Sequence, residues 1–188
     1  MEIEGLTNPR LRDEVGDIRL VVLEDRISGP GTSIIMAAFT HLDPDGSRFT
    51  DGSFGVCYAA RELDTAIEET KYHRAKFMRA TDEGRMELDM RVYVIDLAGL
   101  VHDLRGLKLN FPLVYHPESY GPAQHLAVEL RKQGSQGVVY DSVRRPGGEC
   151  VAIFRPPVLS NCRQERHLCY VWDGHDITAV YEKGRVRM

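Results

Sequence analysis

The chain has 188 residues, 43% of them hydrophobic and 28% charged, and a formal net charge of -4. These values are typical of one globular domain with a hydrophobic core, and they argue against the broad cationic surface that non-specific nucleic-acid binding requires. No apolar run reaches the ~18 residues of a membrane span, and the first residues carry no apolar leader. The four cysteines match neither a disulfide framework nor paired zinc knuckles. We therefore expect a cytoplasmic protein that holds no metal and inserts into no membrane.

The first part of the chain predicts a strand over residues 18–24, IRLVVLE, and a short helix over residues 32–40, TSIIMAAFT. The segment HLDPDGS that follows contains the Pro, Asp and Gly residues that favour turns. A calcium-binding loop is the alternative for DPDG. It lacks the remaining ligand positions and the closing glutamate, so a turn is favoured.

A strand followed by a helix is predicted over residues 56–79. VCYA at 56–59 is typical of a strand, and apolar side chains then recur at helical spacing as far as Phe77. Thr65 and Glu68 fit a capping box, which would satisfy two free amide donors in the first turn of the helix.

The second half of the chain predicts mostly strands. We expect strands over 87–97, 137–143 and 150–154, a helix that begins near Pro122 and ends at Gly134, and a hairpin within 168–184 that turns at Asp173 and Gly174. No repeat or linker divides the chain. The fold class predicted for residues 1–188 is a single α+β domain with mixed, mainly antiparallel sheets and flanking helices.

Two adjacent glutamates on the predicted helix can be separated by geometry. At 100° per residue, Glu68 points away from the apolar stripe, whereas Glu69 lies at its edge, on the same flank as His73 one turn later. Glu69 could therefore face a cleft. The alternative is a surface pair between Glu69 and His73, and Glu68 is expected to be a solvated residue at the helix start.

Three other residues could belong to a site, and each also has a structural explanation. Arg48 could anchor a loop by a salt bridge to Glu62 or Asp64, because arginine often does so. Tyr58 lies within a predicted strand, where aromatic residues usually pack in the core. Ser142 follows a strand and precedes a glycine-rich turn, which its hydroxyl could stabilise.

Taken together, these residues resemble the RES domain, a family named for its arginine, glutamate and serine. The match consists of Arg48, Tyr58 in CYAA, Glu69 eleven residues after it, then His73, and Ser142 within GSQGVVYDSVRRPGGECVAIF. It covers about residues 47–155, and HPESYGPAQHLAVEL resembles the segment that the family places before its serine strand.

One position departs from the pattern of many members of that family. The arginine is followed here by Phe49 instead of tryptophan. An aromatic side chain is kept, so the departure concerns only the fine shape of the pocket.

The resemblance implies a bacterial toxin of a type II toxin-antitoxin pair, with a fold similar to that of ADP-ribosyltransferases and with NAD+ as its substrate. It implies a partner as well, a helix-turn-helix antitoxin of the Xre kind that forms a hetero-oligomer with the toxin. The antitoxin, and not this acidic chain, would then supply the DNA contacts.

The residue types suit that chemistry. Cleavage of the bond between nicotinamide and ribose passes through an oxocarbenium-like cation, which the carboxylate of Glu69 would stabilise. Arg48 would bind the pyrophosphate through its planar fork of donors, and Tyr58 would stack on the nicotinamide. Ser142 would orient Glu69 or a ribose hydroxyl, and His73 would help to bind NAD+.

The acceptor of ADP-ribose stays open at this point. A protein nucleophile, which we favour, would make the chain a mono-ADP-ribosyltransferase, whereas water or phosphate would make it an NAD+-depleting glycohydrolase or phosphorylase. An RNA-cleaving toxin that uses Arg48, Tyr58, Glu69 and His73 for phosphate binding and acid–base catalysis is less favoured because the chain is acidic. A binding module without catalytic activity is the third alternative.

Overall fold

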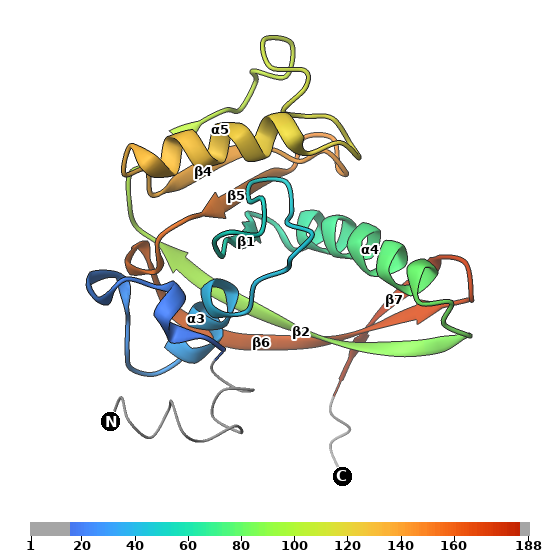
Figure 1. Ribbon diagram of the computed structural model, residues 1–188. Coiled ribbons are helices and arrows are strands. Elements are labelled where there is room, and N and C mark those ends of the chain that lie inside the picture. Colours follow the sequence, from blue (N-terminus) through green and yellow to red (C-terminus); the bar gives the residue numbers. More distant parts are fainter. Residues whose placement is uncertain (1–15, 185–188) are drawn as a thin grey trace.

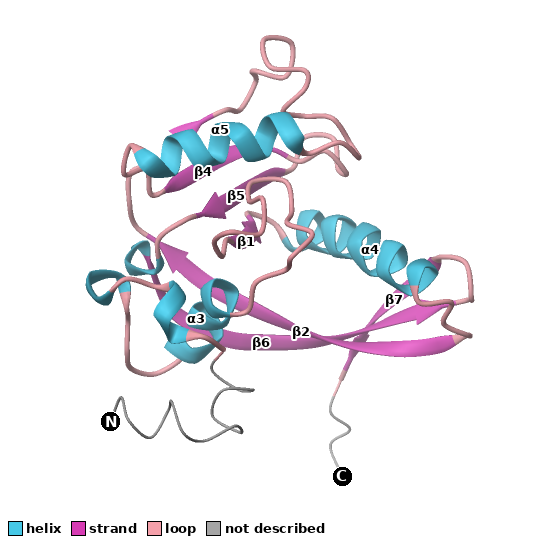
Figure 2. Cartoon of the chain, viewed as in Figure 1, coloured by secondary structure: helices cyan, strands magenta, loops and turns pink. Residues whose placement is uncertain are grey.

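The computed structural model describes residues 16–184 and contains two β-sheets with helices packed on them (Figures 1 and 2). The first sheet has the strand order β1-β5-β4-β3 and the second β2-β6-β7. Strands pair antiparallel throughout, apart from the parallel pair β3 and β4. The fold is therefore α+β with mainly antiparallel sheets, as the sequence predicts.

The elements follow one another in an order that alternates between the two sheets. The helices are α3 (Thr32–Thr40), α4 (Leu63–Ala80) and α5 (Gly121–Lys132). The strands are β1 (Cys57–Ala60), β2 (Met86–Leu97), β3 (His102–Asp103), β4 (Gly137–Asp141), β5 (Glu149–Ile153), β6 (Leu159–Trp172) and β7 (Ile177–Lys183). Short 3₁₀ turns are η1 (Ile18–Leu20), η2 (Leu23–Asp25) and η3 (Pro156–Val158).

The first sheet is covered by α5 on one face (Figure 1). Ala123 and Ala127, one helical turn apart, are fully buried there, and their small side chains let the helix approach the sheet closely. Phe49 packs edge-on against Tyr140 of β4, with 4.9 Å between the ring centroids. This core anchors the residue beside Arg48 and the strand that precedes Ser142.

The opposite face of the first sheet packs against α3 and the start of β6. Cys57 of β1 and Ile153 of β5 share this core with Ile35 and Phe39 of α3. At Gly31, before α3, the backbone φ is +77°, and a Cβ would lie 2.2 Å from the carbonyl oxygen of Cys162. Glycine is therefore required where α3 begins against β6.

The second sheet carries α4. Ala75 and Met78 of the helix pack in one core with Leu168, Tyr170 and Trp172 of β6. Ile177 of β7 belongs to the same core. The Thr70 and Tyr170 hydroxyls lie 2.7 Å apart in a hydrogen bond between helix and sheet. These contacts fix the rotation of α4, and with it the direction in which Glu69 points.

The strand predicted over residues 18–24 is wrong. The segment forms the turns η1 and η2, in which Val21 is buried but Val22 and Leu23 are exposed. The Asp17 side chain accepts a hydrogen bond from the Arg19 amide and starts the first turn. A run of apolar residues does not by itself make a strand, and no strand within residues 16–184 pairs with this segment.

The predicted capping box at Thr65 and Glu68 is also wrong. The N-cap of α4 is Glu62, so Thr65 already lies within the helix, where it is fully buried. The hydroxyl of Thr65 instead contacts the side chains of Glu62 and Arg145.

The hairpin at the end of the chain is longer than predicted, because β6 begins at Leu159 and not near Leu168. Most side chains in its first half are exposed or half-buried, so no alternation of buried and exposed residues marks the strand. The two-residue strand β3 was not predicted. Within residues 16–184, no helix is both long and apolar enough to cross a membrane.

Candidate active site

Glu69 lies on α4, and its carboxylate faces the loop that follows β4. Its Oε1 atom accepts a hydrogen bond from the Ser142 hydroxyl at 2.7 Å and a weaker one from the Cys150 thiol at 3.8 Å. Its Oε2 atom makes no hydrogen bond with any residue in 16–184, and it is not sealed from solvent. One carboxylate oxygen is thus fixed by the protein, and the other is open to a ligand.

Glu68 points elsewhere, as the helical geometry predicts. Its carboxylate pairs with Lys71 at 3.1 Å on the same helix. The alternative of a surface pair between Glu69 and His73 is not what the structure contains, because the hydrogen bonds of Glu69 go to Ser142 and Cys150.

Ser142 is held rigidly by its own loop. Its hydroxyl oxygen accepts hydrogen bonds from the amides of Arg144 at 3.1 Å and Arg145 at 2.9 Å, while its proton is directed to Glu69. Because both its donor and its acceptor capacity are used, the hydroxyl is suited to positioning the carboxylate and unsuited to attacking a substrate. Ser142 thus stabilises its turn and contacts Glu69 at the same time, so the two interpretations of this residue are compatible.

Tyr58 presents its ring to the surface while its hydroxyl is enclosed. The residue is 39% exposed, yet its hydroxyl bonds to the Ser47 hydroxyl at 2.7 Å and accepts from the Phe49 amide at 2.8 Å. Burial of this hydroxyl raises the pKa of Tyr58 to about 12, so the phenol stays protonated. The two hydrogen bonds flank Arg48 in sequence and link β1 to the segment that carries it.

Arg48 is buried, with 8% of its surface exposed, and it pairs with no carboxylate among residues 16–184. Its Nη1 atom donates to the carbonyls of Val114 and His116, both at 2.9 Å, and its guanidinium lies 4.8 Å from the Tyr120 ring centroid. The alternative of a salt bridge to Glu62 or Asp64 is therefore not what the structure contains. Its Nε and Nη2 donors have no hydrogen bond with described residues and are not sealed from solvent.

His73 follows Glu69 by one helical turn, and its pKa depends on nearby charged side chains, Glu69 among them. Burial of its imidazole is the largest effect and lowers the pKa of His73. The negative charge of Glu69 raises this pKa, and the positive charges of Arg144, Lys76 and Arg48 lower it. The ring is therefore neutral near pH 7. Arg48, Glu69 and Arg144 are thus all close enough to His73 to act on its charge.

Arg144 was not singled out from the sequence. Its guanidinium lies 3.3 Å from the Tyr72 ring centroid, and its Nη2 donates to the Pro117 carbonyl. It stands in a run of two arginines, VRRPGG, where residue type alone does not distinguish a site residue from a surface charge. Its position two residues after Ser142 was the available signal.

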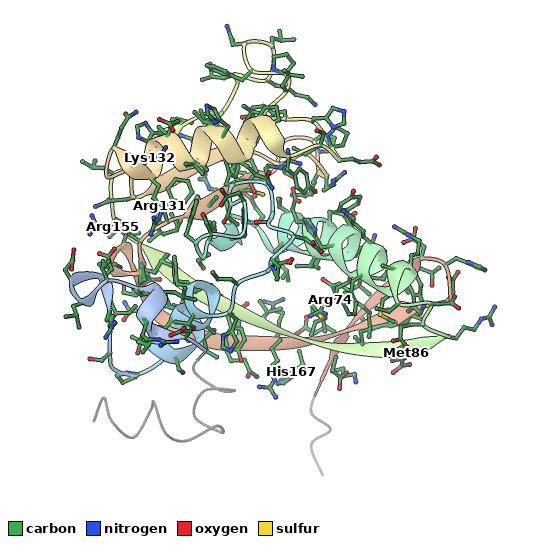
Figure 3. All side chains as sticks on the ribbon, viewed as in Figure 1. Arg74, Met86, Arg131, Lys132, Arg155 and His167 are labelled. Atoms are coloured by element: carbon green, nitrogen blue, oxygen red, sulfur yellow. The ribbon has the colours of Figure 1, made fainter. Side chains whose placement is uncertain are left out.

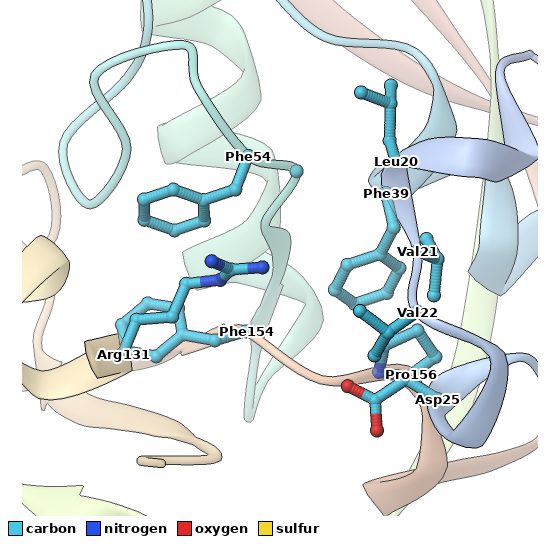
Figure 4. A pocket seen from close by; sticks show the side chains of 10 residues that line it. Leu20, Val21, Val22, Asp25, Phe39, Phe54, Arg131, Phe154 and Pro156 are labelled. Carbon is cyan, nitrogen blue, oxygen red and sulfur yellow. The ribbon is translucent and has the colours of Figure 1, made fainter. Parts of the chain in front are cut away.

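Neither Glu69 nor Arg48 lines either of two cavities formed by the described residues. A groove of about 760 Å³ runs between the sheets and is lined by β1, β2 and the first turns of α4, and Tyr58 borders it while Glu69 and Arg48 do not. A second cavity, of about 20 Å³, has room for one water molecule. There Arg131 lies between Phe54 and Phe154, as Figure 4 shows, and no predicted site residue lines it.

The arrangement offers charge stabilisation and ligand binding without a metal site. Among residues 16–184, no group of three or more His, Cys, Asp or Glu side chains could hold a metal ion. The geometry defines a class of protein, an α+β domain in which a serine holds a glutamate and a buried arginine contacts two backbone carbonyls, while a tyrosine with an exposed ring is hydrogen-bonded to the segment that carries the arginine.

Comparison with known proteins names that class. The family model of the RES domain matches residues 23–173, and this chain belongs to the RES domain family. A protein of Sinorhizobium fredii (strain NBRC 101917 / NGR234), described as uncharacterized protein y4oC, is 31% identical over 182 residues, which are 96% of this chain and 74% of that protein.

Proposed function

We propose that this chain is the toxin of a type II toxin-antitoxin pair, and that it cleaves NAD+ and transfers ADP-ribose to a protein. The observation that carries the proposal is Glu69, whose Oε1 is fixed by Ser142 while Oε2 stays open. Membership of the RES domain family supports NAD+ as the substrate. The resemblance to the ADP-ribosyltransferase fold is part of the same proposal.

The reaction needs a single well-placed negative charge. When the bond between ribose C1′ and the nicotinamide nitrogen breaks, its electron pair leaves with neutral nicotinamide, and positive charge develops on the ribose. The open Oε2 of Glu69 stabilises that charge and accepts a hydrogen bond from a ribose hydroxyl. A nucleophile of the acceptor then bonds to C1′ and loses its proton to solvent.

Arg48 and Tyr58 serve to bind the dinucleotide. The free Nε and Nη2 donors of Arg48 suit a pyrophosphate oxygen, and the absence of a carboxylate partner within the described chain leaves the positive charge uncompensated. The exposed ring of Tyr58 provides a stacking surface for nicotinamide, with its orientation fixed by the two bonds to its hydroxyl. The neutral imidazole of His73 borders the same space.

The partner in this proposal is an Xre-type helix-turn-helix antitoxin that forms a hetero-oligomer with the chain and supplies the DNA contacts. An enzyme that consumes NAD+ is tolerable in a cell only while its site is blocked. The Nε and Nη2 donors of Arg48, which no described carboxylate occupies, give such an inhibitor a target for a carboxylate.

The test is mass spectrometry of the products that purified protein forms from NAD+. We expect free nicotinamide and a protein that has gained the mass of ADP-ribose when a lysate of the host bacterium is present. Free ADP-ribose or its 1″-phosphate without protein labelling would show that water or phosphate is the acceptor. Intact NAD+ in every reaction, with RNA cleaved instead, would contradict the proposal.

A further inference from the structure

Arg144 combines features that a purely structural arginine does not show. Its Nη2 donates to the Pro117 carbonyl and its guanidinium lies 3.3 Å from the Tyr72 ring centroid. Its Nε is the one buried side-chain nitrogen or oxygen without a hydrogen-bond partner in the described part of the chain. A buried unpaired donor is unfavourable, and each one in a native protein calls for an explanation, such as strain, a catalytic role or a bound water or ion.

Neighbouring arginines show the contrast. Arg145 donates to Asp64 at 3.2 Å and to Thr65 at 3.0 Å, and Arg155 pairs with Asp25 at 2.6 Å. Each of these charges is balanced by a carboxylate. No acidic side chain of residues 16–184 lies within ion-pair distance of Arg144. Its Nε is sealed from solvent, but its Nη1 makes no hydrogen bond with these residues and is not sealed, so Nη1 is the donor available to an anion.

Arg144 also belongs to the loop that positions Glu69. Ser142, two residues earlier, donates to Glu69 and accepts from the Arg144 amide. The loop from Val114 to Pro117 connects the two cations, because Arg48 donates to the carbonyls of Val114 and His116, and Arg144 to that of Pro117. Two arginines, both lacking carboxylate partners among residues 16–184, thus donate to the same loop.

We propose that Arg144 is a second phosphate-binding residue, which contacts the phosphate on the nicotinamide side of the dinucleotide while Arg48 contacts the other. The assignment of sides follows from Ser142, which lies two residues before Arg144 in the same loop and donates to Glu69 of α4. The inference rests on the proposed function for its choice of ligand. One cation for each of the two phosphates matches the charge of a pyrophosphate.

Binding of ADP-ribose, measured by isothermal titration calorimetry, tests the inference without any need for turnover. Arg144→Gln and Arg144→Lys should each weaken ADP-ribose by about tenfold or more, since lysine keeps the charge but loses the planar fork. Arg74→Gln is the matched control, because it removes the same charge from α4 on the side of the second sheet, where Arg74 acts on Tyr170 (Figure 3). It should leave ADP-ribose affinity within about twofold.

Kinetics with NAD+ provide a readout that loss of structure alone would not give. Loss of a contact that is made equally before and during bond cleavage raises KM and leaves kcat nearly unchanged. We expect this for Arg144→Gln, with kcat within about threefold of the wild-type value. Thermal unfolding of each variant reports whether the loss of the Tyr72 and Pro117 contacts has disturbed the fold, and the lysine variant retains more of them.

The outcomes separate the two proposals. Wild-type affinity for ADP-ribose in Arg144→Gln, or no binding by the wild type, would overturn the role of Arg144. A loss of affinity in the folded Arg144 variants alone supports it. If the wild type binds ADP-ribose through Arg144 but leaves NAD+ intact, the proposed reaction is wrong and the phosphate site stands.

Discussion

At the scale of single residues, the adjacent glutamates Glu68 and Glu69 have different surroundings and should have different importance. Glu69→Gln keeps the shape of the side chain and the acceptor for Ser142, but removes the charge that stabilises the ribosyl cation. We expect kcat for NAD+ cleavage to fall about 100-fold or more, as for other electrostatic contacts to a transition state. Glu68→Gln loses only a pair with Lys71 and should keep kcat within about twofold.

The measurement is initial-rate release of nicotinamide, with circular dichroism to confirm that both variants fold. Equal losses in the two variants would show that the charge of this helix matters in general and that Glu69 has no special role.

Arg48 should respond to replacement by lysine although the charge is kept. A lysine cannot donate hydrogen bonds to the carbonyls of Val114 and His116 and also keep a planar set of free donors for a phosphate. We expect KM for NAD+ to rise by a factor that corresponds to about 1.5–3 kcal/mol, the range for hydrogen bonds to charged groups. An unchanged KM in a folded Arg48→Lys variant would remove Arg48 from phosphate binding.

At the scale of elements, the rotation of α4 on the second sheet decides which side chains reach the site. Thr70 and Tyr170 join the helix to β6 by a hydrogen bond of 2.7 Å. Tyr170→Phe removes this bond but leaves Thr70 bonded to the Ala66 carbonyl. We expect the free energy of unfolding to fall by about 0.5–1.5 kcal/mol, with activity retained.

Chemical denaturation of Tyr170→Phe beside Tyr181→Phe is the appropriate comparison. Tyr181 is 61% exposed on β7, and removal of its hydroxyl should change stability by less than about 0.5 kcal/mol. If both variants lose the same stability, the hydrogen bond between α4 and β6 contributes nothing specific.

Local sequence patterns predicted the elements that have a regular buried face. The helix over 32–40 and the helix that ends near residue 80 follow from apolar spacing, and β4 and β5 from short buried runs. The pattern failed at residues 18–24, where apolar side chains are exposed, and in the first half of β6, where they are scarce. In both places, pairing between distant segments decides the backbone conformation.

At the scale of the whole molecule, two buried cysteines lie in the cores on opposite faces of the first sheet. Cys150 belongs to the core under α5, and Cys57 to the core with α3. Burial raises the pKa of Cys57 to about 11 and that of Cys150 to about 12, so both thiols stay protonated and unreactive at pH 8.

If the chain is one cooperative domain, both thiols should become reactive together. We expect alkylation by iodoacetamide, followed by mass spectrometry along a urea series, to show one common midpoint for Cys57 and Cys150. Cys162, which is half-buried, serves as the internal comparison for local exposure. Separate midpoints for the two buried thiols would mean that the two cores unfold independently.

The proposed antitoxin should depend on the same cation as the substrate. An inhibitor that blocks the site by inserting a carboxylate would pair with Arg48, so Arg48→Ala should weaken antitoxin binding about tenfold or more. Affinity is measured by surface plasmon resonance with folded variants. Unchanged affinity, together with NAD+ binding by the toxin-antitoxin complex, would contradict inhibition at this site.

The sequence by itself determined the fold class and the residues of the candidate site, because apolar spacing and the order of Arg48, Tyr58, Glu69 and Ser142 can be read along the chain. It also separated Glu69 from Glu68, since helical geometry needs no partner to be known.

Only the tertiary structure decided what each side chain contacts. Arg48 lies 66 residues from Val114 in sequence and Glu69 lies 73 from Ser142, so these hydrogen bonds depend on how α4, α5 and the first sheet pack. The same packing left Arg144 without a carboxylate partner while it paired Arg145 with Asp64, a distinction between two adjacent arginines that no local pattern contains. A contact energy depends on distance in space, and the sequence gives distance only along the chain.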